Sequence, residues 1–406
     1  PLGSDLFMLP DRAPLAAVPQ GDELIEVNEG PDGQLLHAVS AFVAPAYVRL
    51  YHPAFETRPG APDLPLFGYS AVGWMNGRLY VPAVRVDSDQ RQDPYRFDIE
   101  EIERRVTQFK LMHPANQTVK HLEHCALDYH CRAAQNYFLG RWEAPLPAAS
   151  VCNASCIGCI SEQQDINVEA AHKRLTIPAR RDDLIEVAVT HLQRVPNGVV
   201  SFGQGCEGEP LMQGPVLEAT IRGIRSQTDK GVINLNSNAS IPKVVARLAD
   251  AGLDAIRISI NSAQSHLYER YYRPSGYTLE DVLQSAKEMH RRSRFVSLNY
   301  FVFPGVTDSP AELDALSHFI DAGGVNMIQL RNLNIDPELY LQELGEDAVN
   351  SPIGIVPMIH TLRARFPKLR FGYFNPPKTR HYRPGPLPGA KLASIYAADD
   401  SSRPSV

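Results

Sequence analysis

The chain has 406 residues, a net charge of −6 and 6 cysteines. This length suits two or three domains with a large core. Hydrophobic residues make up 44% of the sequence and charged residues 21%, as in ordinary globular proteins. No apolar run reaches the roughly 20 residues of a membrane-spanning helix, which disfavours a membrane partner. The acidic balance disfavours a dedicated nucleic-acid binder, because such proteins carry a basic surface.

Short β-strands are expected near the start of the chain. Residues 1–4, Pro-Leu-Gly-Ser, are typical of the remnant of a removed tag, so the first domain is counted from residue 5. Residues 23–86 are rich in Val, Ala and Tyr and are broken by Pro, which favours short strands. Within them, Asn76-Gly77 predicts a hairpin turn, because both residues tolerate a positive φ.

Two helices are expected next, over residues 98–112 and 117–139. Pro145 and Pro147 then interrupt the chain and indicate a linker. The sequence therefore predicts an N-terminal β-rich and helical domain over residues 5–145.

Strands and helices alternate after this linker, which is typical of parallel βαβ units. The expected strands are a short one before Cys152 and residues 198–202, 231–235, 255–260, 296–302 and 325–330. The expected helices are residues 184–193, 241–251, 278–292 and 310–322. This pattern predicts an α/β fold, a partial (β/α)6 TIM-type barrel over residues 146–375, with its active groups at the C-terminal ends of the strands. Residues 376–406, rich in Pro, Gly and Ser, are expected to form a loop-like or disordered tail.

The strongest chemical signal is the run of Cys152, Cys156 and Cys159, spaced C-x3-C-x2-C. Three thiolates this close can bind three irons of a [4Fe–4S] cluster and leave the fourth iron open to a small molecule. A structural zinc site is one alternative, but it needs four ligands, usually as two spaced pairs, and the sequence has no second C-x2-C. The low cysteine content disfavours the other alternative, a disulfide scaffold.

This segment resembles the cysteine loop of the radical S-adenosylmethionine (radical SAM) superfamily. The resemblance implies that Cys152, Cys156 and Cys159 are catalytic cluster ligands, and that the cofactors are a [4Fe–4S] cluster and S-adenosylmethionine (SAM). It also implies that SAM is split to a 5′-deoxyadenosyl radical, which abstracts hydrogen from a substrate. The family commonly has an aromatic residue before the third cysteine, whereas this chain has Gly158.

A glycine-rich stretch follows the second expected barrel strand. Its Gly203, Gly205 and Gly208 match G-x-G-x-x-G, a dinucleotide motif when it opens the first βα unit of a fold. Here it follows the cysteine loop instead, so the better match is Gly208-Glu209-Pro210. That run is similar to the family's Gly-Gly-Glu-Pro stretch, with Glu207 in place of the first Gly. The resemblance implies that these residues bind the SAM ammonium, which needs acceptors and a close main-chain approach.

Small polar residues close the later strands. Asn and Ser at such places also serve as turn residues or caps, and this alternative stays open. Their repetition at successive strand ends favours a polar rim that suits a ribose and a carboxylate. The resemblance extends to these segments and implies that further cofactor contacts come from Asn236, Asn238, Ser259, Asn261, Val302 and Gln329.

The remaining cysteines raise the question of a second metal site. The expected helix 117–139 carries His121, Cys125 and Cys131 at spacings that bring several ligand-type side chains near one face. Together with Cys206, the thiols Cys125 and Cys131 are candidate ligands of a second Fe–S cluster. The alternative is that these cysteines pack as small buried hydrophobes.

The run Tyr271-Tyr272-Arg273-Pro274 follows the fourth expected barrel strand, residues 255–260. It either lines the mouth of the substrate site or packs against the barrel rim, and the sequence leaves both open.

Three functions fit these observations. The first is a radical SAM enzyme that abstracts hydrogen from a small molecule or natural-product intermediate. The second is a radical SAM enzyme that modifies a peptide or RNA, with the N-terminal domain as docking module. The third is a non-catalytic Fe–S electron-transfer protein, which would need a fully ligated cluster.

The first function is favoured, because the acidic charge disfavours RNA and no cysteine follows Cys206, unlike in the peptide-modifying relatives. The expected partners are a small-molecule substrate and an external electron donor such as flavodoxin or ferredoxin. Reduced thiols and an Fe–S cluster favour a cytoplasmic location.

Overall fold

The computed structural model describes residues 6–9, 12–14, 19–20, 23–24, 27, 29–89, 94–162 and 168–381. A parallel seven-stranded sheet in the order β11-β12-β13-β14-β15-β16-β17 forms its centre. The strands are β11 (Glu143–Pro145), β12 (Val199–Phe202), β13 (Val232–Ser237), β14 (Ala255–Ile260), β15 (Phe295–Val302), β16 (Met327–Asn332) and β17 (Arg370–Gly372). The predicted α/β fold with a parallel, partial TIM-type barrel is confirmed, and β17 is a strand that the sequence did not predict.

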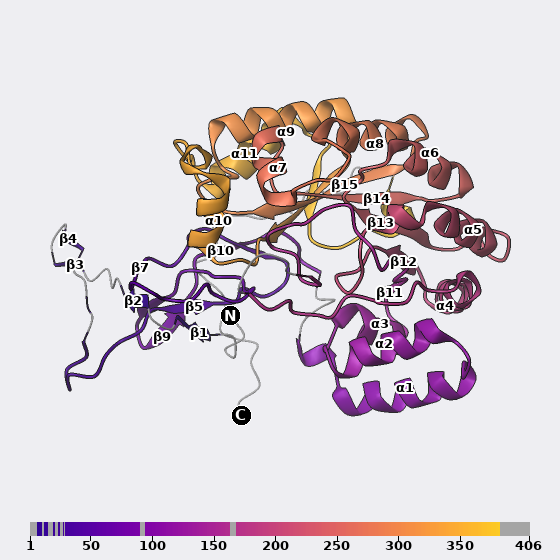
Figure 1. The fold of residues 1–406 in the computed structure, drawn as a ribbon, viewed down its shortest axis with the longest axis horizontal. Helices are drawn as coiled ribbons and strands as arrows, with labels where there is room; N and C mark the ends of the chain where they lie inside the picture. The colour runs from indigo at the N-terminus through magenta and orange to yellow at the C-terminus, as the bar shows by residue number, and fades with distance from the viewer. Residues whose placement is uncertain are drawn as a thin grey trace.

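Helices connect these strands, because parallel neighbours need a crossover. Figure 1 shows α5, α6, α8 and α9 lined up along the outer side of the curved sheet. The connecting helices are α4 (Arg181–Arg194), α5 (Gly214–Arg225), α6 (Pro242–Ala251), α7 (Ser265–Tyr272), α8 (Leu279–Arg291), α9 (Pro310–Gly323), α10 (Pro337–Leu344) and α11 (Ile355–Arg365). The four predicted helices correspond to α4, α6, α8 and α9. Short 3-10 turns in the described residues are η1 (Pro94–Arg96), η2 (Pro210–Gln213), η3 (Glu346–Ala348) and η4 (Lys378–Arg380).

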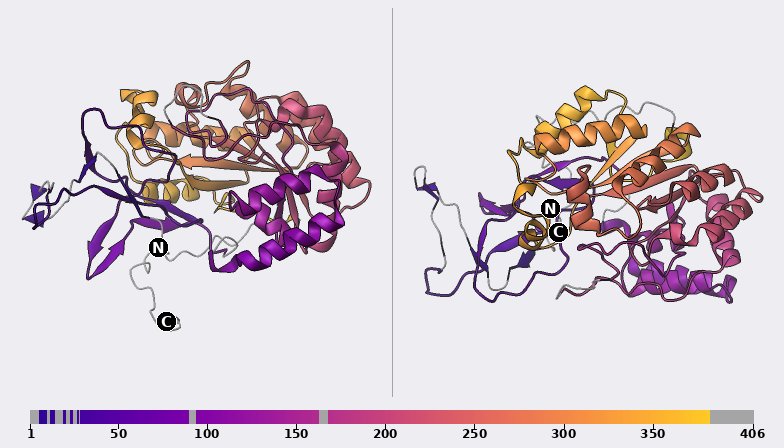
Figure 2. Two further views of the ribbon diagram at one scale, coloured as in Figure 1. Left: turned by 60° about the horizontal axis from the view of Figure 1, so that its bottom comes forward. Right: turned by 45° about the horizontal axis from the view of Figure 1, so that its top comes forward.

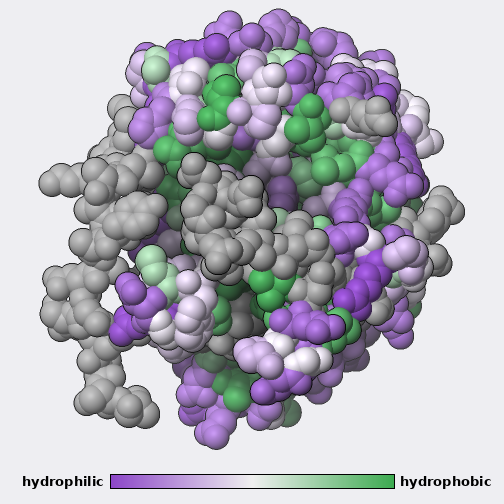
Figure 3. Space-filling model, turned by 90° about the vertical axis from the view of Figure 1, so that its left-hand side faces the viewer, coloured by the Kyte–Doolittle hydropathy of each residue, from purple (hydrophilic) through white to green (hydrophobic). Residues whose placement is uncertain are grey.

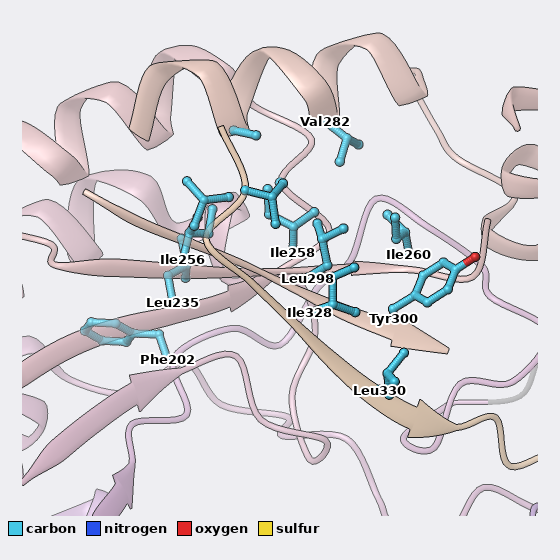
Figure 4. Packing of buried hydrophobic residues seen from close by; sticks show 14 of the residues in the cluster. Phe202, Leu235, Ile256, Ile258, Ile260, Val282, Leu298, Tyr300, Ile328 and Leu330 are labelled. Atoms are coloured by element: carbon cyan, nitrogen blue, oxygen red, sulfur yellow. The ribbon is translucent and has the colours of Figure 1, made fainter. Parts of the chain in front are cut away.

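The two faces of the sheet differ in chemistry. Successive side chains of a strand point to opposite faces. In β14, Ile256, Ile258 and Ile260 are buried in the main hydrophobic cluster, and Figure 4 shows them close to Leu298 and to Val282 of α8. Arg257 and Ser259 lie on the other face and line a cavity. The barrel interior is therefore polar at this end, which leaves room for a ligand.

Short antiparallel pairs make up the described part of the N-terminal segment. The pairs are β1 (Leu6–Met8) with β5 (Val39–Ala41), β2 (Arg12–Pro14) with β7 (Phe55–Thr57), β3 (Pro19–Gln20) with β4 (Glu23–Leu24), β6 (Tyr47–Arg49) with β10 (Ala83–Arg85), and β8 (Gly73–Met75) with β9 (Arg78–Tyr80). The last pair is the hairpin predicted from Asn76-Gly77.

This segment is anchored to the end of β16. The buried Arg49 guanidinium donates to the carbonyl oxygens of Tyr69 and Leu333, at 2.7 and 2.8 Å. The Asn332 side chain bonds Arg49 N and Tyr47 O at 2.9 and 3.0 Å. The N-terminal strands therefore lie against the C-terminal end of the barrel, where functional groups gather.

Three helices form a second N-terminal layer: α1 (Ile99–Met112), α2 (Gln117–Leu127) and α3 (Arg132–Phe138). The single helix predicted over 117–139 is wrong, because the chain turns between α2 and α3. His130 adopts a left-handed φ of 49°, and the Cys131 amide donates to Cys125 O at 2.8 Å. Both views of Figure 2 show this helical layer and the N-terminal strands at different sides of the barrel.

The predicted domain boundary at residue 145 falls at the end of β11, which already belongs to the central sheet. Most of the predicted tail, residues 376–406, lies outside the described residues, which end at 381. In the part of the chain that the structure describes, no helix combines the length and apolarity needed to cross a membrane.

On the face in Figure 3, hydrophilic side chains cover much of the upper edge and hydrophobic ones gather nearer the middle.

Candidate active site

A cavity of about 460 Å³ opens at the C-terminal ends of the barrel strands. All three cysteines of the cysteine loop line it. Six of the predicted cofactor residues line it as well: Gly208, Glu209, Pro210, Asn236, Asn238 and Ser259. A cavity of this size lies in the range of ligand pockets in proteins. The structure thus brings together residues that are more than 100 positions apart in the sequence.

The cysteine loop is held by the end of α7 and the residues that follow it. Ser155 N donates to Tyr272 O and Ile157 N to Tyr271 O, both at 3.1 Å, and Ala154 forms a β-bridge with Pro274. Both tyrosines are buried and both line the cavity. The run Tyr271 to Pro274 therefore does both things that the sequence left open, since it packs against the loop and contributes to the cavity wall.

The loop thiols favour a cationic ligand. Burial, with the nearby Glu209 carboxylate as a smaller cause, raises the pKa of Cys152 to about 11. Burial and the two neighbouring thiols raise the pKa of Cys156 well above its usual value. Thiolates are the form that binds iron, so a positively charged centre is needed to stabilise them here. The three residues fit a [4Fe–4S] cluster in both chemistry and spacing.

Arg174 is a site residue that sequence reasoning missed. Its guanidinium lies 3.6 Å from the Cys159 sulfur and 3.3 Å from Ser161 Oγ, and it forms an ion pair with Glu162. Arg174 stands in a stretch without regular secondary structure or motif, so no sequence signal marked it. A fixed cation beside the loop adds to the stabilisation of a thiolate or an anionic cluster.

Glu207 clamps the loops around the cavity. Its carboxylate accepts hydrogen bonds from four main-chain amides, those of Ala148, Ala149, Gly203 and Gln204, at 2.6 to 2.8 Å. Burial raises the pKa of Glu207 to about 7, and the four N–H groups oppose this rise. A carboxylate has about four acceptor positions. Glu207 therefore ties the start of the cysteine loop to the loop after β12, and its acceptors are taken.

Glu209 joins the same loop to the end of β13. Its carboxylate accepts from Ser237 Oγ at 2.6 Å, Asn238 N at 2.8 Å and Leu211 N at 3.0 Å. Burial raises its pKa to about 7. Three of about four acceptor positions are used, which leaves one for a ligand.

Gly208 is required by a close main-chain approach. A Cβ at this position would lie 2.1 Å from Val151 O. The amides of Gly208 and Glu209 donate to the carbonyl oxygens of Ala149 and Val151 at 2.8 and 2.9 Å. This pairing sets the Gly-Glu-Pro stretch against the cysteine loop.

Three predicted cofactor residues are not among those that line the cavity. Asn261 lies beyond the end of β14 and donates to Leu267 O at 3.2 Å and Tyr340 Oη at 3.3 Å. Val302 is buried in the hydrophobic cluster, and its neighbour Phe301 lines the cavity instead, because adjacent residues of a strand point to opposite faces. Gln329 is fully buried and binds Asn375 Oδ1 through Nε2 at 2.9 Å.

Two arginines line the cavity on β14 and β16. Arg257 donates to Gln329 Oε1 at 3.3 Å, and Arg331 donates to Tyr373 O at 2.8 Å. The Nε of each is buried without a hydrogen-bond partner. Burial, and secondarily Arg331, lowers the pKa of Arg257 to about 9. In the described part of the chain, neither guanidinium forms an ion pair with a carboxylate, so this wall of the cavity is positively charged.

The candidate second site lies apart from this cavity. The structure brings Cys125 and Cys206 together with His121, and their ligand atoms lie within 4.8 Å of one another. Cys131 stands at the start of α3, where burial and, to a smaller degree, the nearby Cys206 thiol raise its pKa. A second Fe–S cluster on Cys125, Cys131 and Cys206 stays a prediction.

The structure is thus a parallel α/β barrel with three thiols of one loop at the C-terminal ends of its strands. Residues 146–316 match the radical SAM superfamily. This match covers the barrel segment, which is therefore similar to the enzymes of that superfamily. No curated protein matches the chain.

Solved structures with a similar fold include the hydrogenase maturase HydG, SuiB and a methyltransferase. HydG from Carboxydothermus hydrogenoformans is 13% identical, with a TM-score of 0.39 and coverage of 66% of this chain and 69% of that one. SuiB from Streptococcus suis is 12% identical, with a TM-score of 0.41 and coverage of 71% and 58%. A radical SAM methyltransferase from Sphaerobacter thermophilus is 15% identical, with a TM-score of 0.39 and coverage of 55% and 64%.

This chain spans 64% of the length of HydG in another crystal structure, and likewise less than two thirds of SuiB and of the methyltransferase. At these identities and TM-scores, the similarities carry no inference about function.

Proposed function

We propose that this protein cleaves SAM at a [4Fe–4S] cluster held by Cys152, Cys156 and Cys159, and acts on a small molecule that carries an anionic group. The observation that carries the proposal is the shared cavity. The three thiols, the Gly-Glu-Pro stretch and the side chains of Arg257 and Arg331 all line the same cavity. A reduced cluster held by these cysteines would supply one electron to the SAM sulfonium, which would give methionine and a 5′-deoxyadenosyl radical able to take a hydrogen atom from the substrate.

The residues of the chain hold and orient these groups. Glu209 keeps one acceptor position for the methionyl ammonium. Gly208 permits the close approach of Val151 O, which sets Glu209 against the cysteine loop. Asn236 donates to Gly203 O at 2.9 Å and Asn238 donates to Asn153 Oδ1 at 2.8 Å, so both amides are oriented beside the cavity. The Ser259 hydroxyl accepts from Asn299 at 3.1 Å. This polar rim suits the ribose and carboxylate of SAM.

The arginine pair supports an anionic substrate. A partly buried guanidinium without an ion pair is unfavourable, and a second one beside it adds to the cost. A carboxylate or phosphate of the substrate would offset that cost, because both match the planar fork of arginine. Arg257 and Arg331 lie on strands β14 and β16 of the barrel interior, where a small molecule can reach them.

The electron enters from a separate donor, for which a flavodoxin or ferredoxin is the proposed class. The Cys159 edge of the loop is partly exposed, and Ile160 beside it is 36% exposed. A donor at this edge would approach the cluster without entering the cavity.

The test is a comparison of the wild type with Cys152→Ala/Cys156→Ala/Cys159→Ala after anaerobic reconstitution. The wild type should form 5′-deoxyadenosine from SAM under dithionite, and the variant should form none. The variant should also lose the electron paramagnetic resonance signal of a reduced [4Fe–4S] cluster. Cleavage of SAM by the variant would refute the proposal.

A further inference from the structure

A second group of ligand-type side chains lies between α2 and the loop after β12. His121 and Cys125 are one turn apart on α2, so both point to the same side of the helix. Cys206 reaches this side from the loop after β12. His121 Nε2 lies 3.4 Å from the Cys206 sulfur and 3.4 Å from the Cys125 sulfur. In the described residues, these three side chains form a potential metal-binding group, because their ligand atoms all lie within 4.8 Å of one another.

These distances match the coordination shell of one metal ion. A tetrahedral zinc ion binds sulfur at about 2.3 Å and imidazole nitrogen at about 2.0–2.1 Å, which places the two ligand atoms about 3.5 Å apart. Both nitrogen–sulfur distances here are close to that value. The backbone therefore already holds the three side chains where a single ion would need them.

The cysteine loop offers an internal comparison. Each cysteine of a [4Fe–4S] cluster binds a different iron, so its sulfurs stand further apart than sulfurs that share one ion. Cys152, Cys156 and Cys159 are not among the groups with closely converging ligand atoms in the described residues. The wider arrangement suits a cluster, whereas the tighter one at Cys206 suits a single ion.

Charge supports the same conclusion. Cys125 is 2% exposed. Two thiolates this close need a cation between them, and a metal supplies it as the protons leave. Cys131 is the neighbouring thiol and the natural fourth ligand, since structural zinc sites have four.

We infer that His121, Cys125 and Cys206 bind a single divalent cation of the zinc class, which joins α2 to the loop after β12. This inference is independent of the proposed function. Cys206 directly precedes Glu207, the residue that clamps the cysteine loop through four amides. The ion would lie outside the cavity and would fix the position of Glu207. Its role would therefore be structural rather than catalytic.

The experiment uses the full chain with Cys152→Ala/Cys156→Ala/Cys159→Ala, so that iron bound by the cysteine loop does not contribute to the measured metal content. Elemental analysis should find about one zinc per chain and iron near zero. Adding Cys206→Ser or His121→Ala should lower the zinc content at least tenfold. His124→Ala, on the same helix but half exposed, is the matched control and should keep the zinc.

A spectroscopic experiment tests the same inference in case a variant folds poorly. Co²⁺ added to the metal-free triple variant should give the absorption of tetrahedral thiolate-bound cobalt, and Cys206→Ser should abolish it. About four irons per chain in the triple variant would overturn the inference in favour of a second Fe–S cluster. Absence of any metal, or a Cys125–Cys206 disulfide in protein purified without oxygen, would overturn it as well.

Discussion

A Cβ on Gly158 would stand 2.7 Å from the Oη atom of Tyr271. Gly158 occupies the position before the third loop cysteine, where the family commonly has an aromatic side chain. In this protein the aromatic ring comes from α7 instead, more than 100 residues later, and it fills the space that Gly158 leaves. Tyr271 is 2% exposed and lines the cavity. An aromatic side chain therefore lies beside this position of the loop, although it comes from a different element.

The first prediction is that Gly158→Ala destabilises the protein. Tyr271 is buried beside the loop, so the added methyl should cost about 1–3 kcal/mol of unfolding free energy, as overpacked cores do. Tyr271→Phe removes the nearest atom and leaves ring carbons at 3.4 Å. Gly158→Ala should therefore cost less in the Tyr271→Phe background. Urea unfolding of the four proteins gives the double-mutant cycle, and equal costs in both backgrounds would contradict the contact.

The second prediction concerns the acceptor position on Glu209. Glu209→Ala should weaken SAM binding by about 1.5–3 kcal/mol, the range for a hydrogen bond to a charged group. The cluster should still assemble, because the cysteines are unchanged. Equilibrium binding of SAM to the reconstituted protein measures the effect. Glu218→Ala on the neighbouring helix α5 is the control, and equal affinity in the two variants would place the ammonium elsewhere.

The barrel strands were predictable because their buried faces leave a local pattern. In β14, apolar Ile256, Ile258 and Ile260 alternate with Arg257 and Ser259, and this period of two is visible in the sequence. β17 escaped prediction because Arg370 to Gly372 is too short to show any period. Helix α5 escaped because it begins with Gly214-Pro215 and contains Gly223, which weaken a helical signal.

The candidate sites were harder to predict where contacts depend on the tertiary structure. The thiol spacing of the loop is local and identified the cluster ligands as candidates. The contacts of Glu207 with Ala148 and Gly203 involve main-chain amides, which have no sequence signature. The turn at His130 has no Gly or Pro to mark it, so the sequence placed Cys131 on the helix face where the structure has His121 and Cys125.

The third prediction tests the positive wall of the cavity. Inorganic phosphate should raise the melting temperature of the protein if Arg257 and Arg331 bind an anion, because a ligand that binds the folded state stabilises it. Arg257→Gln should remove most of that rise. Sodium chloride at the same ionic strength controls for screening. Equal shifts by phosphate in the wild type and Arg257→Gln would mean that this arginine does not bind the anion.

The fourth prediction is a pH dependence that originates at His191. This side chain is 3% exposed and binds Trp142 O through Nε2 at 3.0 Å, and burial lowers its pKa from 6.5 to about 4. Between these two values the unfolded chain binds a proton that the folded chain does not. The free energy of unfolding should therefore fall as the pH drops from about 6.5 to about 4, by roughly 3 kcal/mol in total.

His191→Gln isolates this effect, because Gln can still donate to Trp142 O and does not titrate. The variant should lose stability less steeply than its parent between pH 6.5 and pH 4. Urea unfolding in the background that lacks the three loop cysteines avoids the acid lability of an Fe–S cluster. His360→Gln replaces an exposed histidine and should leave the parent's pH dependence unchanged. If His191→Gln and its parent lose stability in parallel on acidification, the buried imidazole is not the titrating group.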